Sequence, residues 1–118
     1  MKYKIIYLIN LTDGFKNHPF LILDENIDNN TLDVVALTHT PQMFDAFIIS
    51  NKDITTVFNE NEKCKKIIQN YLLNSLPMYI SEFRTVFNSP DNIIIIGKLQ
   101  FYLLNKHNKL NIFKSILA

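Results

Sequence analysis

The residue types most often used in catalysis are few and widely separated in this chain of 118 residues. Three histidines, His18, His39 and His107, lie 21 and 68 residues apart. Zinc sites in small domains usually take their ligands from positions a few residues apart, so this spacing predicts no metal site. The single cysteine, Cys64, belongs to the apolar stripe of an expected helix, where we expect a structural thiol rather than a nucleophile.

Acidic and amide residues alternate in one segment as the first ligands of a calcium loop do: Asp24, Asn26, Asp28 and Asn30. A calcium loop continues with glycine at its sixth position and a bidentate glutamate at its twelfth, and here those positions hold Asn29 and Val35. We therefore interpret the segment as a solvated loop without a metal.

Nucleotide chemistry is not indicated either. The tripeptide Asn51-Lys52-Asp53 is one residue short of the guanine-reading motif of GTPases, and the two glycines of the chain cannot build a phosphate-binding loop. No serine flanked by glycines and no pair of histidines on one helix face is present. The sequence therefore predicts a protein that is not an enzyme and has no cofactor.

Charge is distributed unevenly, although the formal net charge is only +1. Residues 1–62 contain four Lys and nine Asp or Glu, a net charge of −5, and residues 63–118 contain eight Lys or Arg and two Asp or Glu, a net charge of +6. Four acidic residues lie in or beside an expected loop, and we predict them to be the partner-binding residues: Asp24, Glu25, Asp28 and Asp33.

The basic half suggests a second surface. Lys98, Tyr102, Lys106 and Lys109 would align in one stripe if a single helix continued through them. Such a stripe could contact phosphates of nucleic acid while the tyrosine stacks on a base. The acidic residues could instead occupy the basic cleft of a nuclease. The remaining alternative is that both are ordinary solvated faces.

The expected elements indicate an α+β fold in a single compact domain, residues 1–118, with a small N-terminal antiparallel sheet packed against a helical C-terminal two thirds. The expected strands are Tyr3–Ile9, Phe20–Leu23 and Leu32–Thr38, and a loop is expected over Asp24–Thr31. The expected helices are Pro41–Ser50, Glu60–Ser75, Tyr79–Phe87, Ile93–Leu104 and Lys109–Leu117. A strand over Phe44–Ile49 is an alternative, and four consecutive isoleucines make a buried strand the alternative for Ile93–Leu104.

No apolar stretch approaches the roughly 18 residues of a membrane span, and one cysteine suits the reducing cytosol, so we expect a cytoplasmic protein without membrane contact. A small, motif-free protein rich in Ile, Asn and Lys is typical of immunity proteins, phage anti-defence proteins and small regulators. We predict a non-catalytic inhibitor, most specifically an immunity protein that binds and neutralises a bacterial toxin such as a nuclease. The alternative is a small nucleic-acid-binding or regulatory protein, and a small enzyme with a dispersed site ranks third.

Overall fold

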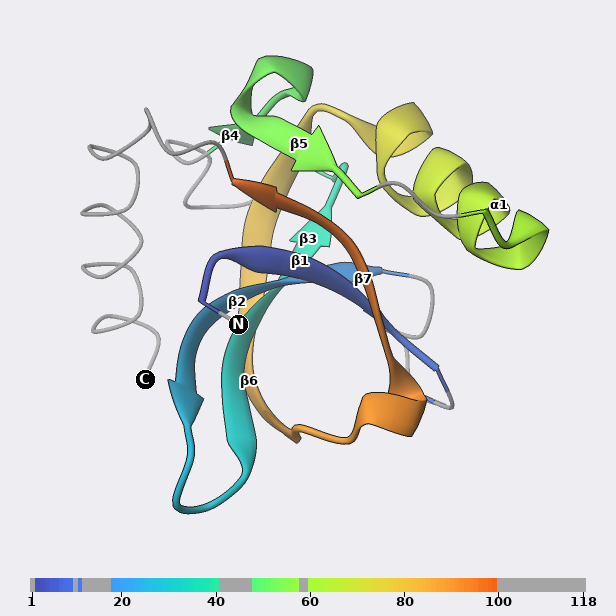
Figure 1. Ribbon diagram of the computed structural model, residues 1–118. Coiled ribbons are helices and arrows are strands. Elements are labelled where there is room, and N and C mark those ends of the chain that lie inside the picture. The colour runs from blue at the N-terminus through green and yellow to red at the C-terminus, as the bar shows by residue number, and fades with distance from the viewer. Residues whose placement is uncertain (1, 10, 12–17, 41–47, 58–59, 100–118) are drawn as a thin grey trace.

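One seven-stranded antiparallel sheet and one α-helix make up the part of the chain described by the computed structural model, residues 2–9, 11, 18–40, 48–57 and 60–99 (Figure 1). The strands are β1 (Lys4–Leu8), β2 (Pro19–Asn26), β3 (Thr31–Thr38), β4 (Ile48–Ile49), β5 (Ile54–Thr56), β6 (Met78–Phe87) and β7 (Ile93–Leu99). The helix is α1 (Glu62–Tyr71), and three 3₁₀ turns are η1 (Asn51–Asp53), η2 (Leu73–Ser75) and η3 (Pro90–Asn92). The strand order is β4-β6-β3-β2-β1-β7-β5.

The predicted fold class is wrong, because the second half of the described chain contributes long strands to the sheet. Tyr79–Phe87 belongs to β6, which pairs with β3 from Thr31 to Thr38, and Ile93–Leu99 forms β7 instead of the start of a helix. The apolar residues of β6 fit a helical stripe, but the segment also contains the β-branched residues that favour strands. Pairing with β3, more than 40 residues away in sequence, decides between the two.

Two further helix predictions involve residues outside the described part of the chain. Of the expected helix Pro41–Ser50, only residues 48–50 are described, and Ile48–Ile49 form the short strand β4. The expected terminal helix Lys109–Leu117 lies wholly outside the described residues.

The three N-terminal strands and one helix are confirmed. β1, β2 and β3 occupy the predicted positions, although β2 and β3 extend into the expected loop and leave only residues 27–30 as a turn. The helix is shorter than predicted and begins after Asn61, whose side chain accepts hydrogen bonds from the backbone N–H groups of Lys63 and Cys64. An asparagine in this position satisfies amides that have no partner within the helix.

The sheet is buried on both faces, which explains why Phe20–Leu23 is continuously apolar rather than alternating. One face packs against α1 through Ile67, Ile68 and the nearby Leu72. The other face carries a second cluster: Ile6, Leu8, Phe20, Ile22, Leu32, Val34 and Ala36. No helix in the described residues is long and apolar enough to cross a membrane.

The two edge strands of the sheet, β4 and β5, are joined by a short connection, residues 50–53, which we call the corner. β4 pairs with β6 and β5 pairs with β7, yet only residues 50–53 separate β4 from β5. Within this corner the backbone N–H and the hydroxyl of Ser50 both donate to Oδ2 of Asp53, at 2.9 and 3.0 Å. Asp53 is only 1% exposed. At the opposite end, residues 88–92 connect the same two strands, β6 and β7, so the sheet curls strongly (Figure 1).

Candidate functional site

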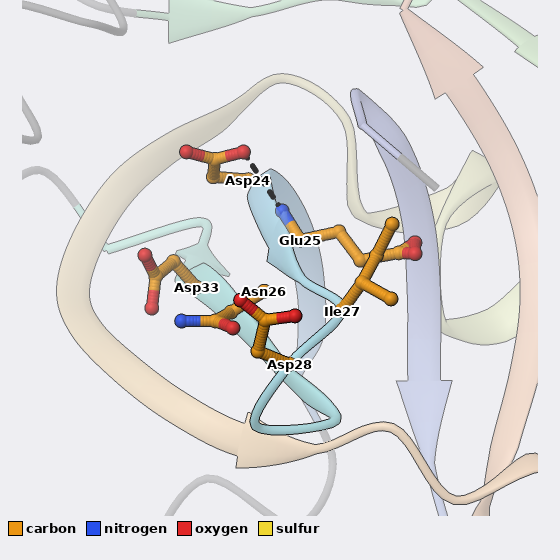
Figure 2. A pocket seen from close by; sticks show the side chains of 6 residues that line it. All are labelled: Asp24, Glu25, Asn26, Ile27, Asp28 and Asp33. Atoms are coloured by element: carbon orange, nitrogen blue, oxygen red, sulfur yellow. Dashed lines mark hydrogen bonds between the residues drawn. The ribbon is translucent and has the colours of Figure 1, made fainter.

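The four predicted partner-binding residues lie together at the end of the β2–β3 hairpin (Figure 2). With Asn26 and Ile27 they line an open hollow of about 420 Å³, which we call the hairpin hollow. Asp24 and Asp33 are direct neighbours across the two strands, Glu25 lies opposite the buried Leu32, and Asp28 lies in the turn. This placement does not test whether the four residues bind a partner, and that role stays a prediction.

The sequence of the turn explains its shape. Oδ1 of Asn26 accepts a hydrogen bond from the backbone N–H of Asn29 at 3.0 Å, and the N–H of Asn30 donates to the carbonyl of Ile27 at 3.3 Å. Asn30 adopts a left-handed conformation with φ of 53°, which asparagine tolerates better than most residues. The carbonyl of Asn30 also accepts from the N–H of Asn88, which ties the turn to the end of β6.

The carboxylates point to both sides of the hairpin. Asp24, Asp33 and Thr85 lie in one row across β2, β3 and β6, and the Thr85 hydroxyl donates to Oδ1 of Asp33 at 3.1 Å. In Figure 2, Glu25 and Ile27 point away from Asp33, toward the side of the hairpin where β1 passes. A bulge at Leu23 in β2 shifts the register between Ile22 and Asp24 and brings Asp24 opposite Asp33.

Exposure and grouping determine what these carboxylates can do. Asp24 and Asp28 are exposed, and Glu25 and Asp33 are half-buried. Among the described residues no group of three or more His, Cys, Asp or Glu side chains is arranged to hold a metal ion. Carboxylates dispersed in this way are suited to contact several separate cationic groups, such as Lys and Arg side chains of a protein.

The other candidate residues are not brought together. Nδ1 of His18 lies 3.1 Å from the carbonyl oxygen of Leu37, His39 is exposed elsewhere, and His107 lies outside the described residues. Cys64 is half-buried on α1. The tripeptide Asn51-Lys52-Asp53 forms the 3₁₀ turn η1.

A tyrosine pair links β1 to α1. The rings of Tyr7 and Tyr71 stack with their centroids 5.0 Å apart. Burial raises the pKa of Tyr7 above its ordinary value of 10.0, and the neighbouring Tyr71 raises it further by its charge and its hydrogen bond. The raised pKa keeps the Tyr7 phenol neutral, and its ring packs against the ring of Tyr71.

The expected lysine stripe does not begin on a helix. Lys98 lies exposed in β7, directly opposite Lys4 of β1 and Thr55 of β5. Side chains alternate sides along a strand, so the helical spacing assumed for Lys98 is wrong. Tyr102, Lys106 and Lys109 lie outside the described residues.

Sequence reasoning missed two exposed apolar side chains. Ile27 is 83% exposed at the hairpin turn, and Phe87 is 76% exposed at the end of β6. Phe87 is the last residue of the expected helix Tyr79–Phe87, and the sequence contains no signal that its side chain is exposed. The sequence does contain a signal that Ile27 is exposed, because Ile27 is the only apolar residue between Asp24 and Thr31.

No family model matches the chain, and neither a curated protein nor a solved structure is found to be similar to it. We therefore infer the function from the side chains that line the hairpin hollow.

Proposed function

We propose that this protein is a non-catalytic inhibitor that binds another protein through the end of its β2–β3 hairpin, most specifically an immunity protein that neutralises a bacterial toxin such as a nuclease. The observation that supports this function is that four acidic side chains line one hollow at the end of one hairpin. We place the binding in the cytoplasm, where the single cysteine would remain reduced.

The chemistry of nuclease clefts fits such a surface. A nuclease binds the phosphates of its substrate with Lys and Arg side chains, and carboxylates can take the place of those phosphates. Opposite charges also raise the rate of association and exclude partners with the wrong charge. The end of the hairpin is held by the pairing of β3 with β6 and by the turn hydrogen bonds, which favours contacts that need little reorganisation on binding.

The nucleic-acid alternative uses the basic C-terminal half, of which Tyr102, Lys106 and Lys109 lie outside the described residues. Its stripe required Lys98 to begin a helical row, and Lys98 lies in a strand. The carboxylates of the hairpin hollow would repel phosphates. Nucleic acid therefore enters as an outcome of the test below rather than as a second proposal.

The test compares the wild-type chain with a hairpin variant, Asp24→Asn/Glu25→Gln/Asp28→Asn. A control variant neutralises three exposed acidic residues outside the hollow, Glu60→Gln/Glu82→Gln/Asp91→Asn, and raises the net charge by the same three units. Each tagged chain is used to capture partners from cells of the native host, with mass spectrometry of the bound protein and assay of bound nucleic acid. The recovered protein is then purified and its Kd for each chain is measured at several salt concentrations.

We expect one stoichiometric protein with the wild-type chain and the control variant. The hairpin variant should bind it at least about ten-fold more weakly, because it loses charge pairs at the interface. Equal binding of the hairpin and control variants would refute the proposal. Recovery of nucleic acid instead of protein, with affinity that falls steeply with salt, would also refute it and favour the alternative.

A further inference from the structure

We propose that Ile27 is the apolar anchor of the hairpin surface, and that the partner presents an apolar socket rimmed by Lys or Arg side chains. This inference rests on the proposed function and specifies the chemistry of its partner. It concerns an apolar side chain, whereas the proposed function depends on the carboxylates, so the two can fail separately.

The exposure of Ile27 sets it apart within the described part of the chain. Ile27 and Phe87 are its two exposed large apolar residues, although almost half of the whole sequence is hydrophobic. Turns are dominated by Gly, Pro, Asn, Asp and Ser, and the other three turn residues here are Asp and Asn. The turn hydrogen bond uses only the backbone carbonyl of Ile27, so the fold does not require an isoleucine side chain there.

The surroundings of Ile27 define what could cover it. Ile27 shares the hollow with four carboxylates, of which Glu25 lies on its own side of the hairpin (Figure 2), and such a surface complements an apolar pocket flanked by cations. The charge excludes a phosphate surface as the occupant, both of nucleic acid and of an anionic membrane, because carboxylates repel phosphates.

An anchor of this kind would contribute much of the affinity. Full burial of an isoleucine side chain corresponds to roughly ten-fold to a hundred-fold in Kd. Hot spots in interfaces are typically side chains buried in well-packed pockets of the partner, and the proposed socket gives Ile27 that position.

Phe87 provides a matched control. It lies opposite Thr31, which in turn lies opposite Asn26, so it shares a face of the sheet with Asn26 and not with Glu25. It is nearly as exposed as Ile27 but does not line the hollow. Replacing Phe87 therefore removes a similar exposed apolar side chain from outside the anchor position.

The experiment titrates the isotope-labelled full chain with three peptides and follows backbone and methyl NMR signals. The first peptide is lysine-rich with a central leucine, the second has glycine in place of the leucine, and the third keeps the leucine but has serine in place of every lysine. The chains are the wild type, Ile27→Thr and Phe87→Thr. Threonine keeps the β-branch of isoleucine and carries a hydroxyl in place of its ethyl group.

We expect the leucine peptide to bind the wild-type hairpin about ten-fold more tightly than the glycine peptide, with shifts in the Ile27 methyl signals. Ile27→Thr should remove that difference, and Phe87→Thr should retain it. The serine peptide should leave the hairpin signals unchanged.

Three results would overturn the inference. Equal affinity of the wild type for the leucine and glycine peptides, with shifts confined to the carboxylate residues, would refute the anchor and leave the acidic interface standing. Equal loss in Ile27→Thr and Phe87→Thr would show a non-specific apolar effect. No shift at the hairpin with either lysine peptide would refute the anchor, whereas the proposed function is decided separately by the Kd values of the captured protein.

Discussion

Replacing the buried carboxylate of Asp53 by the amide of asparagine should destabilise the whole sheet, because this side chain holds the corner between its two edges. Oδ2 of Asp53 accepts hydrogen bonds from both the N–H and the hydroxyl of Ser50, and the N–H of Asp53 donates to the carbonyl of Ser50. The corner connects β4, paired with β6, to β5, paired with β7. Asparagine has nearly the same shape, so the change removes charge rather than volume.

The expected loss follows from these contacts. Hydrogen bonds to a charged group contribute about 1.5 to 3 kcal/mol each, and neutral ones contribute about 1 kcal/mol. Converting two charge-assisted bonds to neutral ones should therefore lower the free energy of unfolding by about 2 kcal/mol. For a chain of this size that corresponds to a fall in Tm of roughly 8 °C.

The assay is urea unfolding followed by far-ultraviolet circular dichroism and by tyrosine fluorescence, since the chain has no tryptophan. Asp91→Asn, an exposed substitution in η3, is the control and should change the free energy of unfolding by less than about 0.5 kcal/mol. Ser50→Ala, alone and combined with Asp53→Asn, completes a double-mutant cycle, in which we expect a coupling of about 1 kcal/mol.

Hydrogen exchange locates the effect. In Asp53→Asn, protection should fall first at the amides that pair β5 with β7, since this edge is adjacent to the corner. The Asp53→Asn variant could unfold at the same urea concentration as Asp91→Asn, or show no coupling to Ser50→Ala. Either result would show that the Asp53 carboxylate does not stabilise the corner.

Two further predictions concern packing and pH. Gly97→Ala should lower the free energy of unfolding by about 1 to 3 kcal/mol, because the new Cβ would lie 3.0 Å from the carbonyl oxygen of Thr55. Thermal unfolding measures this loss, and a variant as stable as the wild type would contradict the close packing at Gly97. The raised pKa of Tyr7 means that the folded state holds its phenolic proton more tightly than the unfolded state, so stability is full below pH 10.0 and falls above it. Phenolate absorbance should show Tyr7 titrating late, and Tyr71→Phe should bring its pKa closer to 10.0; an unchanged titration would contradict the assigned contribution of Tyr71.

Local patterns were sufficient where local physics decides the structure. β1, β2 and β3 were predictable because short apolar runs alternate with turn residues, and α1 because its apolar residues recur with the helical period. The four acidic residues of the hairpin hollow were also predictable as a group. They lie within ten residues of one another, so any hairpin or loop at this point would keep them close.

Local patterns failed where distant partners decide. Tyr79–Phe87 has apolar residues that satisfy a helical stripe and a strand alike, and its pairing with β3 selects the strand. The same holds for Ile93–Leu99, which lies between β1 and β5. The lysine spacing assumed from Lys98 onward depended on the helix and was wrong at that residue for the same reason.

The sequence by itself determined the N-terminal strands, the helix and the gathering of acidic residues near one turn, because each depends on neighbours a few positions apart. Only the tertiary structure decided that Asp24 faces Asp33, since a bulge at Leu23 sets that register. It alone placed Ile27 in solvent beside them and buried Asp53 at the corner between two sheet edges. Those features arise from pairing between segments far apart in the chain, and the free energy of that pairing is not encoded in the local periodicity of either segment.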